Sequence, residues 1–377
     1  MNMTKRLLLF LSTILLTACL QFSCKKSNDL PEKSKANKMV LVYMDANNDL
    51  RYEALNSINR MEKGAKEIDG ILLVYIKTSS VRSYLLKIRH DEDLNRITSD
   101  TLKVFENPVS DAEFLKDVVK YTQSEHPAET YGLVLWSHAT SWAPATPVKT
   151  KSFGRDNGKE MDIIDLKNAL PNNFEFIIFD ACSMGGVEVL YEFRQKAKYI
   201  IASPAETLAE SFPYQTITPL LFRSSDQLNH IAKAYYDYYN AYSGDLQSAT
   251  VVLVQTAELD TLAFAMKSLM MNRKNYGDKL VSEDVQRLDF TLGFPVANYD
   301  FGEFLNKNFQ PVDRTDVYKK LNKAILYKAA TPNFLGINIK SFSGVTCYIP
   351  SINDSNINYY KRLQWYASAG IYVLFDK

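Results

Sequence analysis

Two short apolar runs, each ending in a reactive side chain, constrain the fold of this chain most. Residues 131–138 read Tyr-Gly-Leu-Val-Leu-Trp-Ser-His, and residues 174–182 read Phe-Glu-Phe-Ile-Ile-Phe-Asp-Ala-Cys. Runs of this length, rich in aromatic and β-branched residues, are typical of buried strands in a parallel sheet. Ligands and chemistry collect beyond the carboxyl ends of such strands. The pattern therefore predicts that His138 and Cys182 meet at one edge of a sheet.

Apolar and amphipathic segments alternate through the first half of the chain. We expect further strands at 39–44, 71–76 and 199–203, and helices at 52–68, 111–124, 163–170 and 187–196. This alternation predicts a parallel, doubly wound α/β sheet with flanking helices and right-handed crossovers. Two segments of alternating pattern between residues 80 and 105 predict a hairpin off the main sheet.

The pattern changes near residue 220 and becomes mainly helical. We expect helices at 228–242, 257–271, 302–308 and 317–327, and late strands at 336–339 and 344–349. The predicted organisation is a catalytic domain at 39–219 and a mainly helical C-terminal α+β region at 220–377.

Charge and cysteine content exclude several classes of protein. The 377 residues include 44 basic and 43 acidic residues, so no basic excess points to nucleic acid. Two of the four cysteines lie near the N-terminus, which argues against a disulfide framework, and Cys347 is expected to be an inert core residue. No Cys-x-x-Cys or His-Glu-x-x-His motif is present, so we expect neither a metal site nor another cofactor.

Residues 1–19 have the pattern of a bacterial lipoprotein signal peptide. Lysine and arginine at 5–6 precede an apolar segment at 7–16, too short to span a bilayer comfortably, and Leu-Thr-Ala-Cys ends at Cys19. We expect Cys19 to receive the lipid, with Cys24 as the alternative, and residues 20–38 to form a flexible tether. This predicts a lipid-anchored protein of the bacterial cell envelope, at the outer membrane or periplasmic face. An ordinary cleaved signal peptide would instead give a secreted protein.

Cys182 is the candidate nucleophile and His138 its candidate base. The thiolate is the attacking species in cysteine catalysis, so the thiol needs a base or a positive field nearby. Glycines at 185 and 186 open the next predicted helix, whose N-terminal field favours a thiolate and an oxyanion. The histidines at 90, 126 and 230 lie on a charged loop, a turn and a helix. A single histidine or cysteine at a strand end is more often structural, and it is the pair that indicates catalysis.

Two acidic residues are candidates for a substrate pocket. Asp180 precedes Cys182 by two residues, so in an extended strand both side chains point to the same side. Its carboxylate would line a pocket for a cationic side chain or orient the base; the alternative is an acid bonded to backbone amides. Glu210, in a loop after the next strand, would add a second acidic wall or remain a solvated carboxylate.

Several motifs together resemble the clostripain family of cysteine peptidases, which belongs with the caspases, gingipains and legumains. The resemblance lies in residues 39–50, Leu-Trp-Ser-His at 135–138 with Trp142, and Asp-Ala-Cys-Ser-Met-Gly at 180–185 with Glu188. It continues at Ser203, Glu206, 212–214, 298–304, 348–350 and 363–366. It covers nearly the whole mature chain and implies a caspase-like fold.

The resemblance also implies the roles of site residues. His138 and Cys182 would form the catalytic dyad, and Asp180 and Glu210 would face the pocket for the residue before the cut bond. The implied cleavage after Arg or Lys has a physical reason, because a buried carboxylate pairs with an incoming cation. The backbone amides of Ala139 and Cys182 would hold the oxyanion. The implied substrates are proteins or peptides with Lys or Arg, acted on by a monomer.

The loop between the two dyad residues is a candidate for self-cleavage. Relatives are often zymogens, and Lys149, Lys151 and Arg155 are basic residues on a predicted exposed loop. The three residues are the candidate self-cleavage positions; the alternative is a solvated loop without further role.

One departure from the family concerns the residues after the histidine. The family usually has glycines there, whereas this chain reads Ala-Thr-Ser-Trp at 139–142. The Cβ of Ala139 disfavours a positive φ, which predicts a distorted oxyanion hole or a different loop path. A catalytically silent surface binding protein and a thiol acyl-hydrolase on non-peptide substrates therefore stay open. Calcium dependence also stays open, with Asp45 and Asp49 as candidate ligands or as solvated loop acids.

Overall fold

The computed structural model describes residues 34–142, 153–156, 159–273, 280–290, 298–351 and 354–375. The described residues from Lys35 onward form one compact unit. The predicted signal peptide, Cys19 and Cys24 lie outside the described residues, as does most of the predicted tether.

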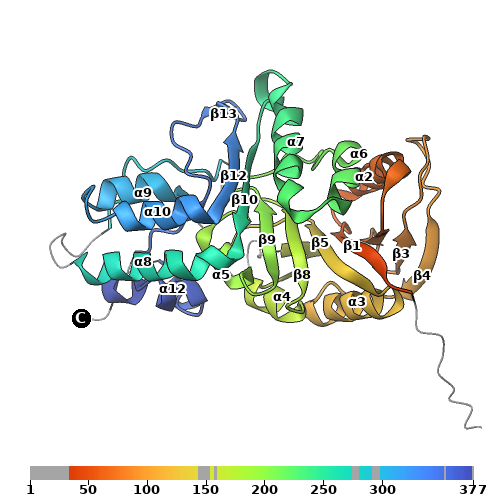
Figure 1. Cartoon of the computed structure of the whole chain (residues 1–377), viewed down its shortest axis with the longest axis horizontal. Coiled ribbons are helices and arrows are strands. Elements are labelled where there is room, and N and C mark those ends of the chain that lie inside the picture. The colour runs from red at the N-terminus through yellow and green to blue at the C-terminus, as the bar shows by residue number, and fades with distance from the viewer. Residues whose placement is uncertain are drawn as a thin grey trace, which may run out of the picture. The chain divides into compact units, whose positions relative to one another are not determined.

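A nine-stranded mixed sheet forms the centre of the compact unit (Figure 1). Its strand order is β12-β10-β9-β8-β5-β1-β2-β3-β4. The five central strands are parallel: β1 (Ala36–Asp45), β2 (Ile71–Lys77), β5 (Ala128–Trp136), β8 (Phe174–Asp180) and β9 (Ala197–Ala202). Most of their residues are buried, as expected of strands covered on both faces. The predicted doubly wound core is therefore confirmed.

The edge beyond β2 corrects one prediction. Strands β3 (Arg82–Lys87) and β4 (Asp100–Glu106) form the expected hairpin, but β3 pairs with β2 along Leu73↔Lys87 to Lys77↔Ser83. The hairpin therefore extends the main sheet instead of lying off it. The physical reason is that this edge of β2 carries backbone N–H and C=O groups that need partners, and β3 supplies them.

The opposite edge is built from the second half of the chain, which the sequence pattern did not indicate. Strand β10 (Thr250–Gln255) pairs antiparallel with β9, and β12 (Ile325–Ala330) pairs antiparallel with β10. The helix predicted at 317–327 is wrong at its end, because α10 spans Thr315–Ala324 and the chain continues as β12. A six-residue apolar run such as β10 has no periodicity that separates a buried strand from a helix.

Helices cover both faces of the sheet (Figure 1). On one face α2 (Arg51–Gly64), α6 (Tyr214–Ile217) and α7 (Leu228–Asn240) enclose one apolar core. On the other face α3 (Ala112–Glu125), α4 (Ile163–Ala169), α5 (Val187–Phe193) and α8 (Leu259–Met271) enclose the second core. The structure is thus a three-layer α/β sandwich with the sheet in the middle.

The remaining elements are short. They are β6 (Phe153–Asp156), β7 (Lys159–Met161), β11 (Tyr299–Asp300), α9 (Phe301–Asn308), β13 (Asn333–Phe334), β14 (Ile337–Asn338), β15 (Thr346–Cys347), α11 (Ile357–Tyr360) and α12 (Gln364–Ser368). Cys347 is buried in β15 and is a free thiol, as expected of a core cysteine.

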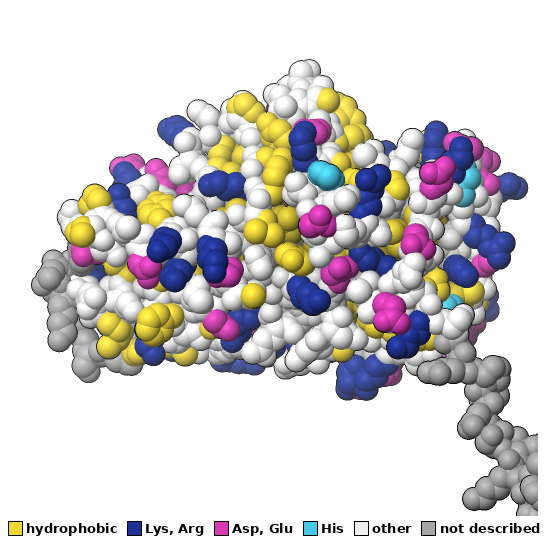
Figure 2. Space-filling model, in the orientation of Figure 1, with side chains coloured by type: hydrophobic (Ala, Val, Ile, Leu, Met, Phe, Trp, Pro, Cys, Tyr) yellow, Lys and Arg dark blue, Asp and Glu magenta, His cyan; other side chains and the backbone are white. Residues whose placement is uncertain are grey.

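The surface agrees with the balanced charge of the sequence. Figure 2 shows basic and acidic side chains interspersed over the visible face. Within the described ranges, no helix has the length and apolar character needed to cross a bilayer.

Candidate functional site

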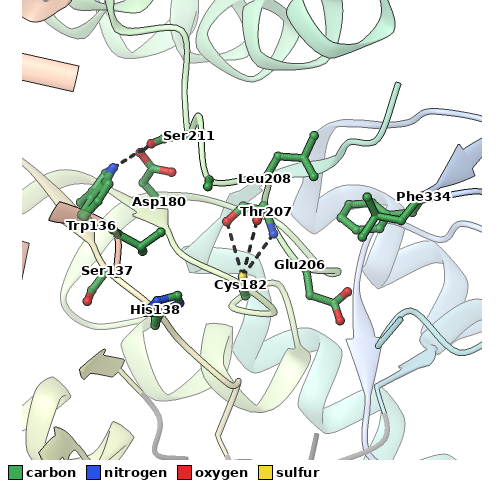
Figure 3. Close-up of a pocket in the computed structure, with 13 residues that line it drawn as sticks. Trp136, Ser137, His138, Asp180, Cys182, Glu206, Thr207, Leu208, Ser211 and Phe334 are labelled. Atoms are coloured by element: carbon green, nitrogen blue, oxygen red, sulfur yellow. Dashed lines mark hydrogen bonds between the residues drawn. The ribbon is translucent and has the colours of Figure 1, made fainter. Parts of the chain in front are cut away.

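The register of the sheet brings His138 and Cys182 together. Strands β5 and β8 are parallel neighbours in which Trp136 lies opposite Asp180. His138 and Cys182 each follow that pair by two residues, so both leave the sheet at the same edge. Both line a cavity of about 290 Å³ (Figure 3). Its lining is Leu50, Trp136, Ser137, His138, Asp180, Cys182, Glu206, Thr207, Leu208, Ala209, Ser211, Phe334 and Leu335.

The thiol of Cys182 is partly buried and held by one residue. The backbone N–H of Thr207 donates to Sγ at 3.3 Å, and Thr207 Oγ1 lies 3.6 Å from Sγ. Burial raises the pKa of the Cys182 thiol; the two Thr207 contacts lower it, and the charges of Glu206 and Asp180 add to the rise. The free thiol therefore favours its protonated form, and a reacting cysteine here needs a base beside it.

The turn after Cys182 is strained and firmly anchored. Ser183 has a φ of 61°, which is unusual for a residue with a Cβ. Its N–H donates to Ala205 O at 2.8 Å, and the N–H of Gly185 donates to Ser203 O at 2.8 Å. A Cβ on Gly185 would lie 2.7 Å from the backbone nitrogen of Pro204, so only glycine fits. The turn thus holds the thiol at the cavity.

Asp49 is a site residue that the sequence did not assign to this role. Its Oδ1 lies 2.9 Å from His138 Nε2. The loop that carries Asp49 follows β1, which is the neighbour of β5 in the sheet. Asn48 shapes this loop, because its side chain donates to Asp45 O and accepts from Leu50 N–H. Three adjacent strands therefore deliver a cysteine, a histidine and a carboxylate.

Asp180 lies at the cavity with its carboxylate buried. Tyr214 Oη donates to Oδ2 at 2.7 Å, and Ser211 Oγ donates to the same oxygen. Trp136 Nε1 donates in turn to Ser211 Oγ at 2.8 Å. Burial raises the pKa of Asp180 to about 6, against the lowering effect of the two hydroxyl donors. A cation entering the cavity would stabilise the ionised form.

The second acidic group of the cavity is Glu206, where the sequence pointed to Glu210. Glu210 is exposed and accepts a hydrogen bond from Tyr238 Oη at 3.0 Å, and it is not among the lining residues. Glu206 is buried, lines the cavity and accepts from Phe290 N–H at 2.9 Å. In Figure 3 Asp180 lies on one side of Cys182 and Glu206 on the other. Both glutamates follow β9, and the loop path that separates them is set by tertiary packing.

The loop after His138 takes a path that does not need glycine next to the histidine. Ser141, with a φ of 66°, has the left-handed conformation in this loop, and Ala139 does not have a positive φ. Ala139 pairs with Phe153 through an isolated bridge. Ala139 therefore carries no left-handed strain, because the left-handed residue lies two positions later. Whether the amides of Ala139 and Cys182 hold an oxyanion stays a prediction.

Trp142 fixes the far end of this loop. Its ring is fully buried and packs against Tyr348, Tyr359 and Tyr360, with ring centroids 5.0, 6.3 and 5.0 Å away. Aromatic contacts at these distances add about 0.5–1.5 kcal/mol each beyond area burial. The beginning of the loop is thus held by the sheet and its end by the C-terminal segment.

The candidate self-cleavage positions are only partly described, whereas Asp45 and Asp49, the acids considered as calcium ligands, are described. Lys149, Lys151 and the side chain of Arg155 lie outside the described residues; the backbone of Arg155 belongs to β6. Asp49 faces His138, and Asp45 accepts from Ser110 Oγ at 2.9 Å. Within the described ranges, no group of three or more His, Cys, Asp or Glu side chains is arranged to hold a metal ion.

A buried carboxyl behind the cysteine turn leads to a pH prediction. Burial raises the pKa of Glu188 to about 7, against hydrogen bonds from Tyr348 and its own backbone. The folded protein therefore binds more protons than the unfolded chain between about pH 4.5 and pH 7, and stability falls as pH rises through that window. Glu188→Gln should remove this loss, raising the free energy of unfolding by about 2–3 kcal/mol at about pH 8 and by much less at about pH 5.

The measurement is denaturant unfolding of both proteins at the two pH values. Glu192→Gln on the same helix is the control. Glu192 pairs with Lys167 at 2.8 Å, and its loss should destabilise the protein by leaving Lys167 without its partner. An equal effect of Glu188→Gln at both pH values would contradict the assignment.

Comparison with known proteins shows to which family this chain belongs. A model of the clostripain family matches residues 42–371. This chain belongs to the clostripain family. Clostripain of Hathewaya histolytica is 25% identical over 234 residues, which cover 51% of this chain and 44% of that protein. The match thus spans less than half the length of this curated clostripain.

Solved structures of clostripain-family proteins show the same fold. An inactive zymogen C11 protease from Parabacteroides distasonis is 29% identical with a TM-score of 0.77, over 90% of this chain and 99% of that one. A secreted C11 cysteine protease from Bacteroides thetaiotaomicron, in complex with an irreversible peptide inhibitor, is 27% identical with a TM-score of 0.77. That match covers 88% of this chain and 98% of the other. The predicted caspase-like α/β fold is confirmed.

Proposed function

We propose that this protein is a cysteine endopeptidase that cuts after Arg or Lys with Cys182 and His138. The observation that carries the proposal is one cavity lined by Cys182, His138 and the buried carboxylate of Asp180. Membership of the clostripain family supports the peptidase chemistry. Asp180 supports the basic specificity, because its bonded partners are neutral hydroxyls and its burial favours a cationic ligand.

The proposed mechanism follows from these positions. A Lys or Arg side chain of the substrate enters the cavity and pairs with Asp180. His138 takes the thiol proton, and Cys182 Sγ bonds to the carbonyl carbon of that residue. The backbone amides of Ala139 and Cys182 stabilise the oxyanion. His138 then gives its proton to the leaving amine, which breaks the C–N bond, and activates a water molecule that hydrolyses the thioester.

Asp49 is proposed to orient the imidazole of His138. Asp49→Asn should lower kcat by about 3- to 10-fold with little change in KM, because an exposed pair of this kind contributes about 1 kcal/mol. The measurement is steady-state hydrolysis of a peptide ending in Arg or Lys. Asp93→Asn, on an exposed loop, is the control and should have no effect. A kcat for Asp49→Asn equal to wild type would remove Asp49 from the mechanism.

Activation and location are part of the proposal. We propose that the chain is made as a zymogen and cuts itself after Lys149, Lys151 or Arg155, and a zymogen structure in the family supports this. We also propose a lipid anchor at Cys19, or alternatively Cys24, which holds a monomeric enzyme at the bacterial cell envelope. Its partners are then protein substrates with Lys or Arg.

The experiment that tests the function is a panel of fluorogenic peptides with Arg, Lys, Asp or Leu before the reporter, with and without calcium. Cleavage restricted to the Arg and Lys peptides supports the proposal. Cleavage of none of them by folded, processed protein would overturn it and favour the silent binding protein. Hydrolysis of thioesters or esters without peptide cleavage would favour an acyl-hydrolase.

A further inference from the structure

A buried polar network lies beside the proposed catalytic cavity and outside its lining. Lys77, at the end of β2, is fully buried, and its Nζ donates to Asp156 Oδ2 at 2.6 Å and to Ser110 Oγ at 2.9 Å. Ser110 Oγ donates to Asp45 Oδ1 at 2.9 Å, and Asn47 Nδ2 donates to Asp156 Oδ1. A lysine buried this completely is rare unless it is paired.

The network joins segments that are far apart in the sequence. Asp45 ends β1, Lys77 ends β2, and Ser110 precedes α3, whereas Asp156 belongs to β6. Strand β6 pairs with the short β7 and with Ala139, and it is not a strand of the nine-stranded sheet. The Lys77–Asp156 ion pair is therefore a direct link between the sheet and this outlying segment.

Strand β6 in turn holds the backbone of the proposed catalytic base. The N–H of Gly154 donates to His138 O at 3.0 Å, and Ser137 Oγ donates to Asp45 O at 2.6 Å. Gly154 has a φ of 75°, and a Cβ there would lie 3.0 Å from Asp45 Oδ2, so the approach needs glycine. The network thus reaches the backbone around His138 in two ways. Asp45 accepts from Ser137, the residue before His138, and β6 bonds to the carbonyl of His138 through Gly154.

We propose that the Lys77–Asp156 ion pair positions the catalytic base. It keeps β6 against the segment that carries His138 and so keeps the imidazole aligned with Cys182. The inference rests on the proposed function. If the chain is cut after Lys149 or Lys151, the first described strand of the new fragment is β6, and its loss would release the carbonyl of His138. The Lys77–Asp156 pair then holds β6 of the new fragment against the carbonyl of His138 after the cut.

The charges of the Lys77 network favour a role in positioning other residues over a role in binding substrate. The network carries one basic and two acidic side chains, and the hydrogen bonds of Lys77 and Asp156 are directed at each other and at polar neighbours. Burial opposes the ionised form of Asp156, but the bonds from Lys77 and Asn47 outweigh it and lower its pKa. The ion pair therefore persists at neutral pH, where removing one partner leaves the other charge buried and unpaired.

The test uses Lys77→Met and Asp156→Asn in the full chain. Both should lower kcat by at least about 10-fold with KM within about 2-fold of wild type, because substrate contacts remain while the base is misaligned. The matched control is Lys167→Met, which breaks the partly buried Lys167–Glu192 pair away from the cavity. The control should lose stability without this change in kcat.

A second readout separates this proposal from the proposed function. The rate at which iodoacetamide alkylates Cys182 depends on thiolate formation and needs no peptide substrate. The rate should fall in Lys77→Met and Asp156→Asn but not in Lys167→Met, even if wild type cuts no peptide. Folded variants with wild-type alkylation rate and wild-type kcat would overturn the positioning role. Failure of the peptide panel alone would overturn only the function.

Discussion

Cys182→Ala is expected to abolish peptide cleavage, lowering kcat/KM by at least about 10⁴-fold, because Cys182 is the proposed nucleophile and carries the one thiol among the described residues that line the cavity. The fold should persist, since the turn is anchored by the backbone bonds of Ser183 and Gly185. The measurement combines hydrolysis of Arg and Lys peptides with gels of the purified protein. The gels should show a single uncut chain if cleavage in the 145–160 segment is self-catalysed.

Cys347 provides the matched control for this experiment. It is the other described free thiol, buried in β15, where burial raises its pKa well above the usual value. Cys347→Ala should retain activity and lose only the stability of a small buried group. Cleavage that survives in Cys182→Ala, or cut bands in that variant equal to wild type, would assign the chemistry or the processing elsewhere.

Asp180→Asn is expected to lower kcat/KM for Arg and Lys peptides by about 10²- to 10³-fold. The magnitude is that of a buried charge-assisted contact removed from a site built around it. An asparagine oxygen can still accept from Ser211 and Tyr214, so the cavity should keep its shape. The neutral side chain also suits burial, so stability at neutral pH should not fall.

Glu206→Gln and Glu210→Gln complete that experiment. The structure places Glu206 in the cavity wall and Glu210 on the surface beside Tyr238, so only the first should change substrate preference. Loss of basic specificity in Glu210→Gln with Asp180→Asn unaffected would contradict the pocket proposed here. It would assign the role to Glu210, the second of the two acidic residues that the sequence indicated.

The sequence predicted the parallel core and the meeting of His138 with Cys182 because both depend on local patterns. A buried strand that ends in a polar residue is readable without knowledge of its neighbours. Asp49 was visible only as a loop acid or a candidate calcium ligand, since its contact with His138 depends on β1 lying beside β5. Strands β10 and β12 pair with segments remote in sequence, and a short apolar run such as β10 does not by itself show that it is a strand. What could not be predicted was therefore the pairing of distant segments.

The packing of Trp142 has a consequence for biosynthesis. Its partners Tyr348, Tyr359 and Tyr360 come much later in the chain than the loop that follows His138, and they pack over it. A growing chain has its strands β5 and β8 long before it has these rings. The loop beside His138 therefore cannot reach its final packing until this later segment has been synthesised and has folded against Trp142.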